Sequence, residues 1–318
     1  MAEIGTDIQR AKELLEQGGL VGIPTETVYG LAANGLDAKA ASNIFKVKKR
    51  PSFDPLILHT YSLAALEKFA GPIPEKALKL TEKYWPGPLT LVLPKKEVVP
   101  AIVSSGLPTV AVRVPNHPLT LELLKSLAFP LAAPSANPFG FVSPTTAQHV
   151  NDYLGNEVDY ILDGGKCSVG LESTIISFTT EKPQILRKGG LAIEDVQALI
   201  GEVEVKSHST SQPEAPGMLS KHYSPGVPLV LGNLEELIEK YKHLRYGVIS
   251  FSKKYHTQEP AISKVLSEDE DLAEAARNLF AFLREFAELK PEIVLAEQVP
   301  QFGLGLAIND RLKRAAAS

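Results

Sequence analysis

The sequence is poor in cysteine, and Cys167 is the only one among its 318 residues. A single cysteine cannot form a disulfide within the chain, and it excludes zinc sites built on paired cysteines. The seven histidines follow none of the usual metal-binding spacings, so we expect no metal site made by protein side chains. No base is placed to activate Cys167, which favours a buried thiol over a catalytic nucleophile.

Long apolar runs are also missing. No stretch approaches the ~18 consecutive apolar residues of a membrane-spanning helix. The first residues, MAEIGTDIQRAKELLEQ, are charged and amphipathic, unlike a secretory signal. We therefore expect a cytoplasmic protein without a membrane partner.

Neither sign of charge is in large excess, because 33 lysines and arginines face 37 acidic residues and leave a net charge of −4. This balance argues against a general nucleic-acid coat but allows a local basic groove. Apolar residues make up 44% and charged residues 22%, which excludes disordered and fibrous classes. The length suggests about two domains.

Strand and helix patterns alternate in the first two thirds of the chain. Short apolar runs predict strands at 20–23, 56–58, 89–93, 109–114, 131–133, 160–162, 174–178 and 184–187. Helical patterns lie between several of them, as at 75–84 and 145–154, and Thr6 or Asp7 can cap a first helix. Some connections are too short for a parallel crossover, so we predict an α/β fold with a mixed sheet flanked by helices.

The composition changes after Ile200. Residues 207–226 are rich in serine, proline and glycine, which is typical of a linker. Beyond them the sequence predicts strands at 228–231, 246–251 and 293–295, with helices at 234–241, 271–289 and 306–314. We therefore predict a first domain at 1–206, a linker at 207–227 and a small Rossmann-like domain at 228–318.

Two early segments combine polar or charged residues with strand or helix ends. Residues 24–34 follow a strand, and Pro24 and Gly30 bracket a polar loop. It is either a ligand loop or an ordinary strand–helix turn whose hydroxyls bond the local backbone. Residues 39–50 hold five cations and no acid, as in a solvated helix face or an anion site. Lys48 and Arg50 meet at the helix end, which favours the anion site.

Three later segments have similar features. Arg113 ends a strand on the face opposite three valines, so it either reaches solvent or binds an anion. Ser135 and Asn137 follow a short strand and could bind a ligand or form a turn. Residues 163–174 are glycine-rich but match neither a phosphate-binding loop nor a nucleophile elbow.

Together these segments resemble a known family. PTETVYGL, KxRP followed by DPLILH, WPGPLTLVL, TVAVRVPNHP, APSAN and GLESTII are similar to the YrdC-type threonylcarbamoyl-adenylate synthases. The KxR and SxN pairs are that family's recognised motif. The segments APGMLSKHYSPG and GLGLAINDRLKRAA resemble the longer form, which carries an additional C-terminal domain. The similarity thus covers nearly the whole chain.

The resemblance implies both a fold and a reaction. The fold is a YrdC-like twisted mixed sheet flanked by helices around a cationic cavity, plus a small Rossmann-like domain joined by a linker that closes the cavity. L-threonine, bicarbonate and ATP, with Mg²⁺ arriving on the nucleotide, give threonylcarbamoyl-AMP and pyrophosphate. A downstream tRNA threonylcarbamoyl transferase then modifies an adenosine beside the anticodon. Any tRNA contact of this chain itself would be weak or indirect.

The resemblance also assigns residues. Those matched to threonine binding are Thr27, His59, Arg113, Ser173 and, through its backbone, Ala133. Those matched to ATP binding are Arg50, Asp54, Thr109, Ser135, Asn137, Ser143, Arg187 and Ser224. Lys48 and Arg50 are the implied catalytic cations. Asp54 departs from the family's usual asparagine, so it must face Mg²⁺ or an arginine, or lose its contact with ATP.

Two alternatives remain open on the sequence. One is a non-enzymatic RNA-binding module that uses the basic cavity, and a salt titration of tRNA binding would distinguish it from an ATP-dependent enzyme. The other is a different carbamoyl-adenylate transferase on the same core. Such proteins carry zinc-finger and acylphosphatase-like modules, for which this cysteine-poor chain has no room.

Overall fold

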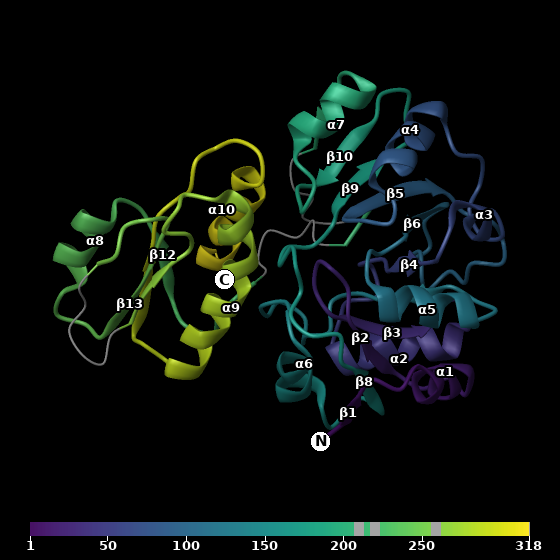
Figure 1. Ribbon diagram of the computed structural model, residues 1–318, viewed down its shortest axis with the longest axis horizontal. Coiled ribbons are helices and arrows are strands. Elements are labelled where there is room, and N and C mark those ends of the chain that lie inside the picture. Colours follow the sequence, from purple (N-terminus) through teal and green to yellow (C-terminus); the bar gives the residue numbers. More distant parts are fainter. Residues whose placement is uncertain (207–212, 217–222, 256–261, 318) are drawn as a thin grey trace.

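The computed structural model describes residues 1–206, 213–216, 223–255 and 262–317. They form two sheets, of eleven and four strands, with helices around both (Figure 1). No helix among these residues is both long and apolar enough to cross a bilayer.

The large sheet has the strand order β1-β8-β2-β3-β7-β4-β6-β5-β9-β10-β11. The strands are β1 (Glu3–Gly5), β2 (Val21–Ile23), β3 (Gly30–Asn34), β4 (Ile57–His59), β5 (Leu89–Pro94), β6 (Thr109–Arg113), β7 (Leu131–Ala132), β8 (Tyr160–Leu162), β9 (Thr174–Ser177), β10 (Gln184–Arg187) and β11 (Glu204–Val205). Parallel pairs such as β4–β6 and antiparallel pairs such as β5–β6 both occur. The predicted mixed sheet is therefore confirmed.

Helices cover the two faces of this sheet unequally. The helices are α1 (Ile8–Glu16), α2 (Ala38–Lys48), α3 (Leu63–Leu66), α4 (Glu75–Tyr84), α5 (Pro118–Ser126), α6 (Ala147–Leu154) and α7 (Ile193–Ile200). The main apolar core joins α2, α4, α6 and α7 to one face, whereas α1 and α5 pack on the other face over β2, β3, β7 and β8. On that second face, β4, β5, β6, β9 and β10 carry only a small apolar cluster that includes Ala215.

The small sheet has the order β12-β15-β13-β14, and all its neighbouring strands are parallel. Its elements are β12 (Leu229–Leu231), α8 (Leu234–Tyr241), β13 (Tyr246–Ser250), β14 (Ser263–Val265), α9 (Leu272–Leu289), β15 (Ile293–Ala296) and α10 (Gly305–Ala316). Parallel strands joined through helices give the Rossmann-like arrangement that the sequence predicts. In Figure 1, α9 and α10 lie on the side turned toward the large sheet, and α8 lies on the far side.

One apolar cluster joins the part of the chain that forms the large sheet, here called the first half, to the part that forms the small sheet, here called the C-terminal half. Val28, Val142 and Leu171, from loops of the first half, pack with buried residues of α9 and α10. Gly170 lies so close to α9 that an added Cβ would be 2.5 Å from the Cα of Arg277, and its φ of +77° also favours glycine. The C-terminal helices therefore pack directly against the loops that precede and follow the strands of the large sheet.

Several predicted boundaries are wrong. The polar loop bracketed by Pro24 and Gly30 leads into a strand rather than a helix, because 30–34 form β3 between β2 and β7. The helix expected from 145 begins at Ala147, since the Thr146 hydroxyl accepts a hydrogen bond from the His149 N–H and caps it. Asp7, rather than Thr6, caps α1. The sequence did not predict β1, β3, β11 or β14.

Candidate active site

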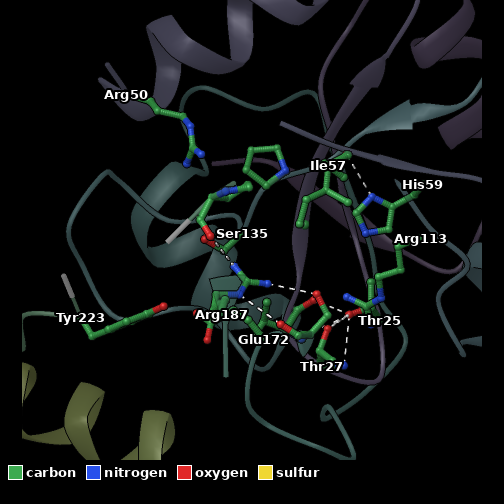
Figure 2. Close-up of a pocket in the computed structure, with 16 residues that line it drawn as sticks. Thr25, Thr27, Arg50, Ile57, His59, Arg113, Ser135, Glu172, Arg187 and Tyr223 are labelled. Atoms are coloured by element: carbon green, nitrogen blue, oxygen red, sulfur yellow. Dashed lines mark hydrogen bonds between the residues drawn. The ribbon is translucent and has the colours of Figure 1, made fainter. Parts of the chain in front are cut away.

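The candidate active site is a cavity with about 550 Å³ of empty space, counting the part that is open to solvent. Eight residues that the resemblance matches to substrates line it: Thr27, Arg50, His59, Arg113, Ala133, Ser135, Ser173 and Arg187. Figure 2 shows the guanidinium groups of Arg50, Arg113 and Arg187 reaching it from different elements. All three arginines are less than a tenth exposed. The cavity is therefore suited to an anionic ligand.

Strand register places the first group of side chains. His59 of β4 lies beside Arg113 of β6 in the parallel pair, and Thr90 of β5 lies on the other side of Arg113. Arg113 Nη2 is 2.8 Å from Glu26 Oε1, a charge contact whose angle is not that of a hydrogen bond. Its Nε donates to the carbonyl of Gly87 at 3.2 Å. Of the two outcomes expected for Arg113, exposure to solvent is wrong, because the side chain is buried and paired with the Glu26 carboxylate.

His59 is neutral at physiological pH. Burial, together with the nearby charge of Arg113, lowers its pKa to about 3. Its Nδ1 lies 3.3 Å from the carbonyl of Ile57. A neutral imidazole can both donate and accept a hydrogen bond, so His59 can bind a hydroxyl or an amine without adding charge.

The loop before β3 supplies hydroxyl groups to the same end of the cavity. Thr25 Oγ1 donates to the carbonyl of Val28 at 2.6 Å and lies 2.8 Å from Thr27 Oγ1. Both threonines are buried and line the cavity. Thr25 therefore bonds the local backbone, as expected of an ordinary turn, while both threonines line the cavity, as expected of a ligand loop.

Arg187 and Ser173 form a second group. Arg187 donates through Nε to the Ser173 carbonyl at 3.1 Å and through Nη2 to the Ser173 hydroxyl at 3.0 Å. Its Nη1 donates to the carbonyl of Pro216 at 3.3 Å. Burial lowers the pKa of Arg187 to about 10, and the neighbouring Glu172 opposes that shift. Arg187 therefore stays charged.

The KxR and SxN pairs meet in the structure. Lys48, in the last turn of α2, donates from Nζ to the carbonyl of Ser135 at 2.6 Å and to the carbonyl of Asn137. The side-chain amide of Asn137 donates to the carbonyls of Pro138 and Phe141, at 2.9 Å each. Lys48 therefore holds the loop that presents Ser135 to the cavity.

Arg50 lies just beyond the end of α2. Lys49 adopts a left-handed conformation with φ 52°, and the chain turns so that the Arg50 N–H donates to the carbonyl of Phe45. The Arg50 guanidinium donates to the carbonyls of Asp54 and Pro55 at 3.0 and 2.9 Å. These hydrogen bonds fix the Arg50 side chain, part of which lines the cavity.

Asp54 faces this arginine. Its Oδ2 lies 2.9 Å from Arg50 Nη2, and both side chains are buried. Burial raises the pKa of Asp54, whereas Arg50 and Lys48 act in the opposite direction. Of the three outcomes expected for this carboxylate, the structure shows the one in which it faces an arginine.

Each of the two interpretations of the basic segment 39–50 is correct for part of it. Lys39, Lys46 and Lys49 are exposed, as on a solvated helix face. Lys48 and Arg50 are buried at the cavity and its supporting loop. The segment is thus neither a uniform surface patch nor a uniform anion site.

The remaining matched residues do not line the cavity: Lys48, Asp54, Thr109, Asn137, Ser143 and Ser224. Ser143 donates its hydroxyl to Glu172 at 2.7 Å. Ser224 is held by a backbone bond from its N–H to the carbonyl of Gly140. Cys167 is buried, and burial raises its pKa to about 12, as befits an unreactive thiol.

Sequence reasoning did not assign Glu172, Pro216 or Tyr223, which also line the cavity. Glu172 lies inside the GLESTII segment that carries the resemblance, so the sequence did contain a signal that this residue belongs to the site. Pro216 and Tyr223 lie within the predicted linker, whose composition gave no sign that they would be buried.

Comparison with known proteins agrees with this geometry. Residues 13–189 match the Sua5/YciO/YrdC family model, which is described as telomere recombination. Residues 191–317 match the model described as threonylcarbamoyl-AMP synthase, C-terminal domain. A threonylcarbamoyl-AMP synthase of Pyrococcus abyssi is 42% identical over 97% of this chain and 93% of its own length. The chain belongs to the threonylcarbamoyl-AMP synthase family.

Further relatives extend the match to other organisms and to structure. A threonylcarbamoyl-AMP synthase of Bacillus subtilis is 40% identical, over 97% of this chain and 92% of its own. The crystal structure of P. abyssi Sua5 complexed with L-threonine superposes with a TM-score of 0.93 at 40% identity, over 100% of this chain and 98% of that one. As a member of this family, the chain is an adenylyl-transferring enzyme that makes threonylcarbamoyl-AMP for tRNA modification.

Proposed function

We propose that the cavity binds L-threonine at its Arg113 end and ATP at the end formed by Arg50, Ser135 and Arg187. One observation supports this division: Arg50, Arg113 and Arg187 are all buried, and all three line the same cavity. Arg113, with neutral His59 and the Thr27 hydroxyl beside it, offers partners for a carboxylate and a hydroxyl. The P. abyssi relative was crystallised with L-threonine, which supports one amino-acid site.

In the proposed reaction, bicarbonate reacts with the threonine amine to give a carbamate and water. A carbamate oxygen then attacks the α-phosphorus of ATP, the bond to the β-phosphate oxygen breaks, and pyrophosphate leaves. This route needs no covalent enzyme intermediate. Fixed cations and alignment provide most of the help in such transfers, and Arg50 and Arg187 are placed to supply them. Lys48 acts by holding the Ser135 loop.

Magnesium enters this proposal with the nucleotide. Among the described residues, no group of three or more histidine, cysteine or acidic side chains could hold a metal ion. Asp54, the carboxylate near Arg50, is already paired with that arginine. We therefore assign the ion's coordination to phosphate oxygens and derive no step from protein ligands.

Shelter from water is the role proposed for the linker. Pro216 and Tyr223 line the cavity from this segment, whereas residues 207–212 and 217–222 lie outside the described part of the chain. Closing a site over a labile carbamate and adenylate prevents their hydrolysis. The product would pass to a tRNA threonylcarbamoyl transferase, and tRNA contact with this chain would be weak or indirect.

A pyrophosphate-release assay tests the proposal. We expect release from ATP only when both L-threonine and bicarbonate are present, with threonylcarbamoyl-AMP as the second product. Equal release without threonine would overturn the proposed division of the cavity. Salt-sensitive tRNA binding without any release would instead favour the RNA-binding module.

A further inference from the structure

A buried carboxylate lies among the groups proposed to bind ATP. Glu172 lines the cavity and is 6% exposed. Its Oε1 accepts the hydroxyl of Ser143, and its charge acts on Arg187 in the same wall (Figure 2). An uncompensated negative charge at this position would repel the phosphates of ATP. It would also attract the guanidinium of Arg187, which is proposed to bind those phosphates.

The compensating charge comes from the C-terminal half. Arg311 of α10 is fully buried, and its Nε donates to Glu172 Oε2 at 3.0 Å. Its Nη2 donates to the carbonyl of Lys188 at 2.8 Å, and its Nη1 donates to Asp310 at 2.6 Å. Arg311 thus reaches from the small sheet's helix to the wall of the cavity.

The carboxylate is ionised in this arrangement. Burial by itself would raise the pKa of Glu172, but Arg311, then Arg187 and the Ser143 hydroxyl, outweigh burial and lower that pKa to about 2. The pair therefore consists of two full charges. Breaking such a buried pair on one side leaves the other charge unmatched.

We infer that Arg311 is a positioning residue for ATP, which neutralises Glu172 so that Arg187 remains available to the nucleotide. The inference rests on the proposed function, because that proposal places ATP beside Arg187. It assigns to the C-terminal half a charge-balancing role at the site. Asp310 pairs with both Arg311 and Arg314, so the two carboxylates and the three arginines (187, 311 and 314) leave one net positive charge, and loss of Arg311 leaves none.

Arg311 has a second contact that a test must separate from charge. Its guanidinium lies 5.0 Å from the ring centre of Tyr223, which also lines the cavity. A variant without Arg311 loses this contact and the charge together. Neutralising Glu172 in the same variant restores the charge balance but leaves the Tyr223 contact missing.

The test compares the Michaelis constants for ATP and threonine in Arg311→Met, Glu172→Gln and the double variant. We expect Arg311→Met to raise the KM for ATP about tenfold or more while the KM for threonine changes much less. The double variant should return the KM for ATP to near the wild-type value. A double variant that binds ATP as poorly as Arg311→Met would overturn the charge-balancing role.

Arg284→Met is the matched control. Arg284 is another buried arginine of the C-terminal half; it donates to the carbonyl of Val142 at 3.3 Å and lies 4.1 Å from the ring centre of Tyr153. We expect this variant to leave the ratio of the two KM values unchanged. A rise in the ATP constant equal to that of Arg311→Met would show that docking, rather than charge, is responsible.

Three outcomes distinguish failure of the inference from failure of the proposed function. If Arg311→Met does not fold, the double variant still decides, since a KM for ATP more than about tenfold above wild type would overturn the inference. If wild-type protein shows no threonine-dependent pyrophosphate release, the proposed function fails. If wild type is active and Arg311→Met shows no preferential change for ATP, only the inference fails.

Discussion

At the scale of single residues, the site is built from buried charges that already have partners. Arg113 contacts Glu26, and Arg50 contacts Asp54. A ligand carboxylate or phosphate must therefore share each guanidinium rather than meet a bare charge. Such pairing keeps the arginines in place while the cavity is empty.

Arg113→Ala should raise the KM for threonine far more than the KM for ATP, because it removes the proposed partner of the threonine carboxylate. Loss of a buried charged partner typically costs a few kcal/mol, so an increase of about a hundredfold is expected. Steady-state pyrophosphate release measures both constants. A larger effect on ATP would mean that the two ends of the cavity are assigned the wrong way round.

His59 gives a prediction about pH. Its pKa is lowered from 6.5 to about 3, so the unfolded chain binds this proton more readily than the folded one. Folding stability is therefore unaffected by His59 above pH 6.5 and falls as the pH drops toward 3, because only the unfolded chain takes up the proton. The loss in the free energy of unfolding reaches about 3 kcal/mol at pH 4. Urea unfolding at pH 7 and pH 4 should show a smaller loss for His59→Gln. Identical losses in both proteins would contradict the prediction.

At the scale of elements, short polar caps fix where helices begin. The side chain of Asp37 accepts hydrogen bonds from the N–H groups of Lys39 and Ala40 at the start of α2. This helix carries Lys48 in its last turn. The cap is exposed and far along the helix from that lysine, so stability and chemistry can be separated here.

Asp37→Ala should lower the free energy of unfolding by about 1 kcal/mol and leave turnover nearly unchanged. Asp37→Asn is the control, since asparagine keeps the capping oxygen and caps about as well as aspartate. Urea unfolding of the three proteins checks the difference. Equal destabilisation by both substitutions would point to the charge rather than to the cap.

The elements also show what the sequence could predict. Strands such as β8 and β10 and helices such as α4 and α8 match the predicted ranges, because local apolar patterns determine them. In contrast, β1 is largely exposed and exists through pairing with β8, far away in the sequence. Likewise, β3 carries Gly30 and Asn34 at its ends and depends on β2 and β7. Distant pairing leaves little mark on the local pattern.

The same distinction applies to the site. The resemblance brought together arginines and hydroxyls that the strands do place around one cavity. Burial of Tyr223 depends on a stack with Phe280 at 5.3 Å between ring centres and on a cation–π contact with Arg311. Both partners lie in α9 and α10, so the linker composition alone could not reveal it.

At the scale of the whole molecule, the linker is expected to retain the product. Replacing residues 207–226 by a glycine–serine chain of equal length removes Pro216 and Tyr223 from the cavity wall. We expect the adenylate to be lost to hydrolysis several times faster, because water gains access. Following threonylcarbamoyl-AMP against pyrophosphate over time measures this. If the altered protein retained product as well as wild type, the linker would have no sheltering role.

The shared apolar cluster has a thermodynamic consequence. Val28, Val142 and Leu171 each stand next to a residue of the substrate region, namely Thr27, Ser143 and Glu172, while they themselves pack with α9 and α10. The substrate region and the apolar cluster cannot unfold independently, because neighbouring residues of the same loops belong to one and to the other. Calorimetry of the full chain should therefore record one cooperative heat-absorption peak, and saturating nucleotide should move that whole peak upward rather than split it.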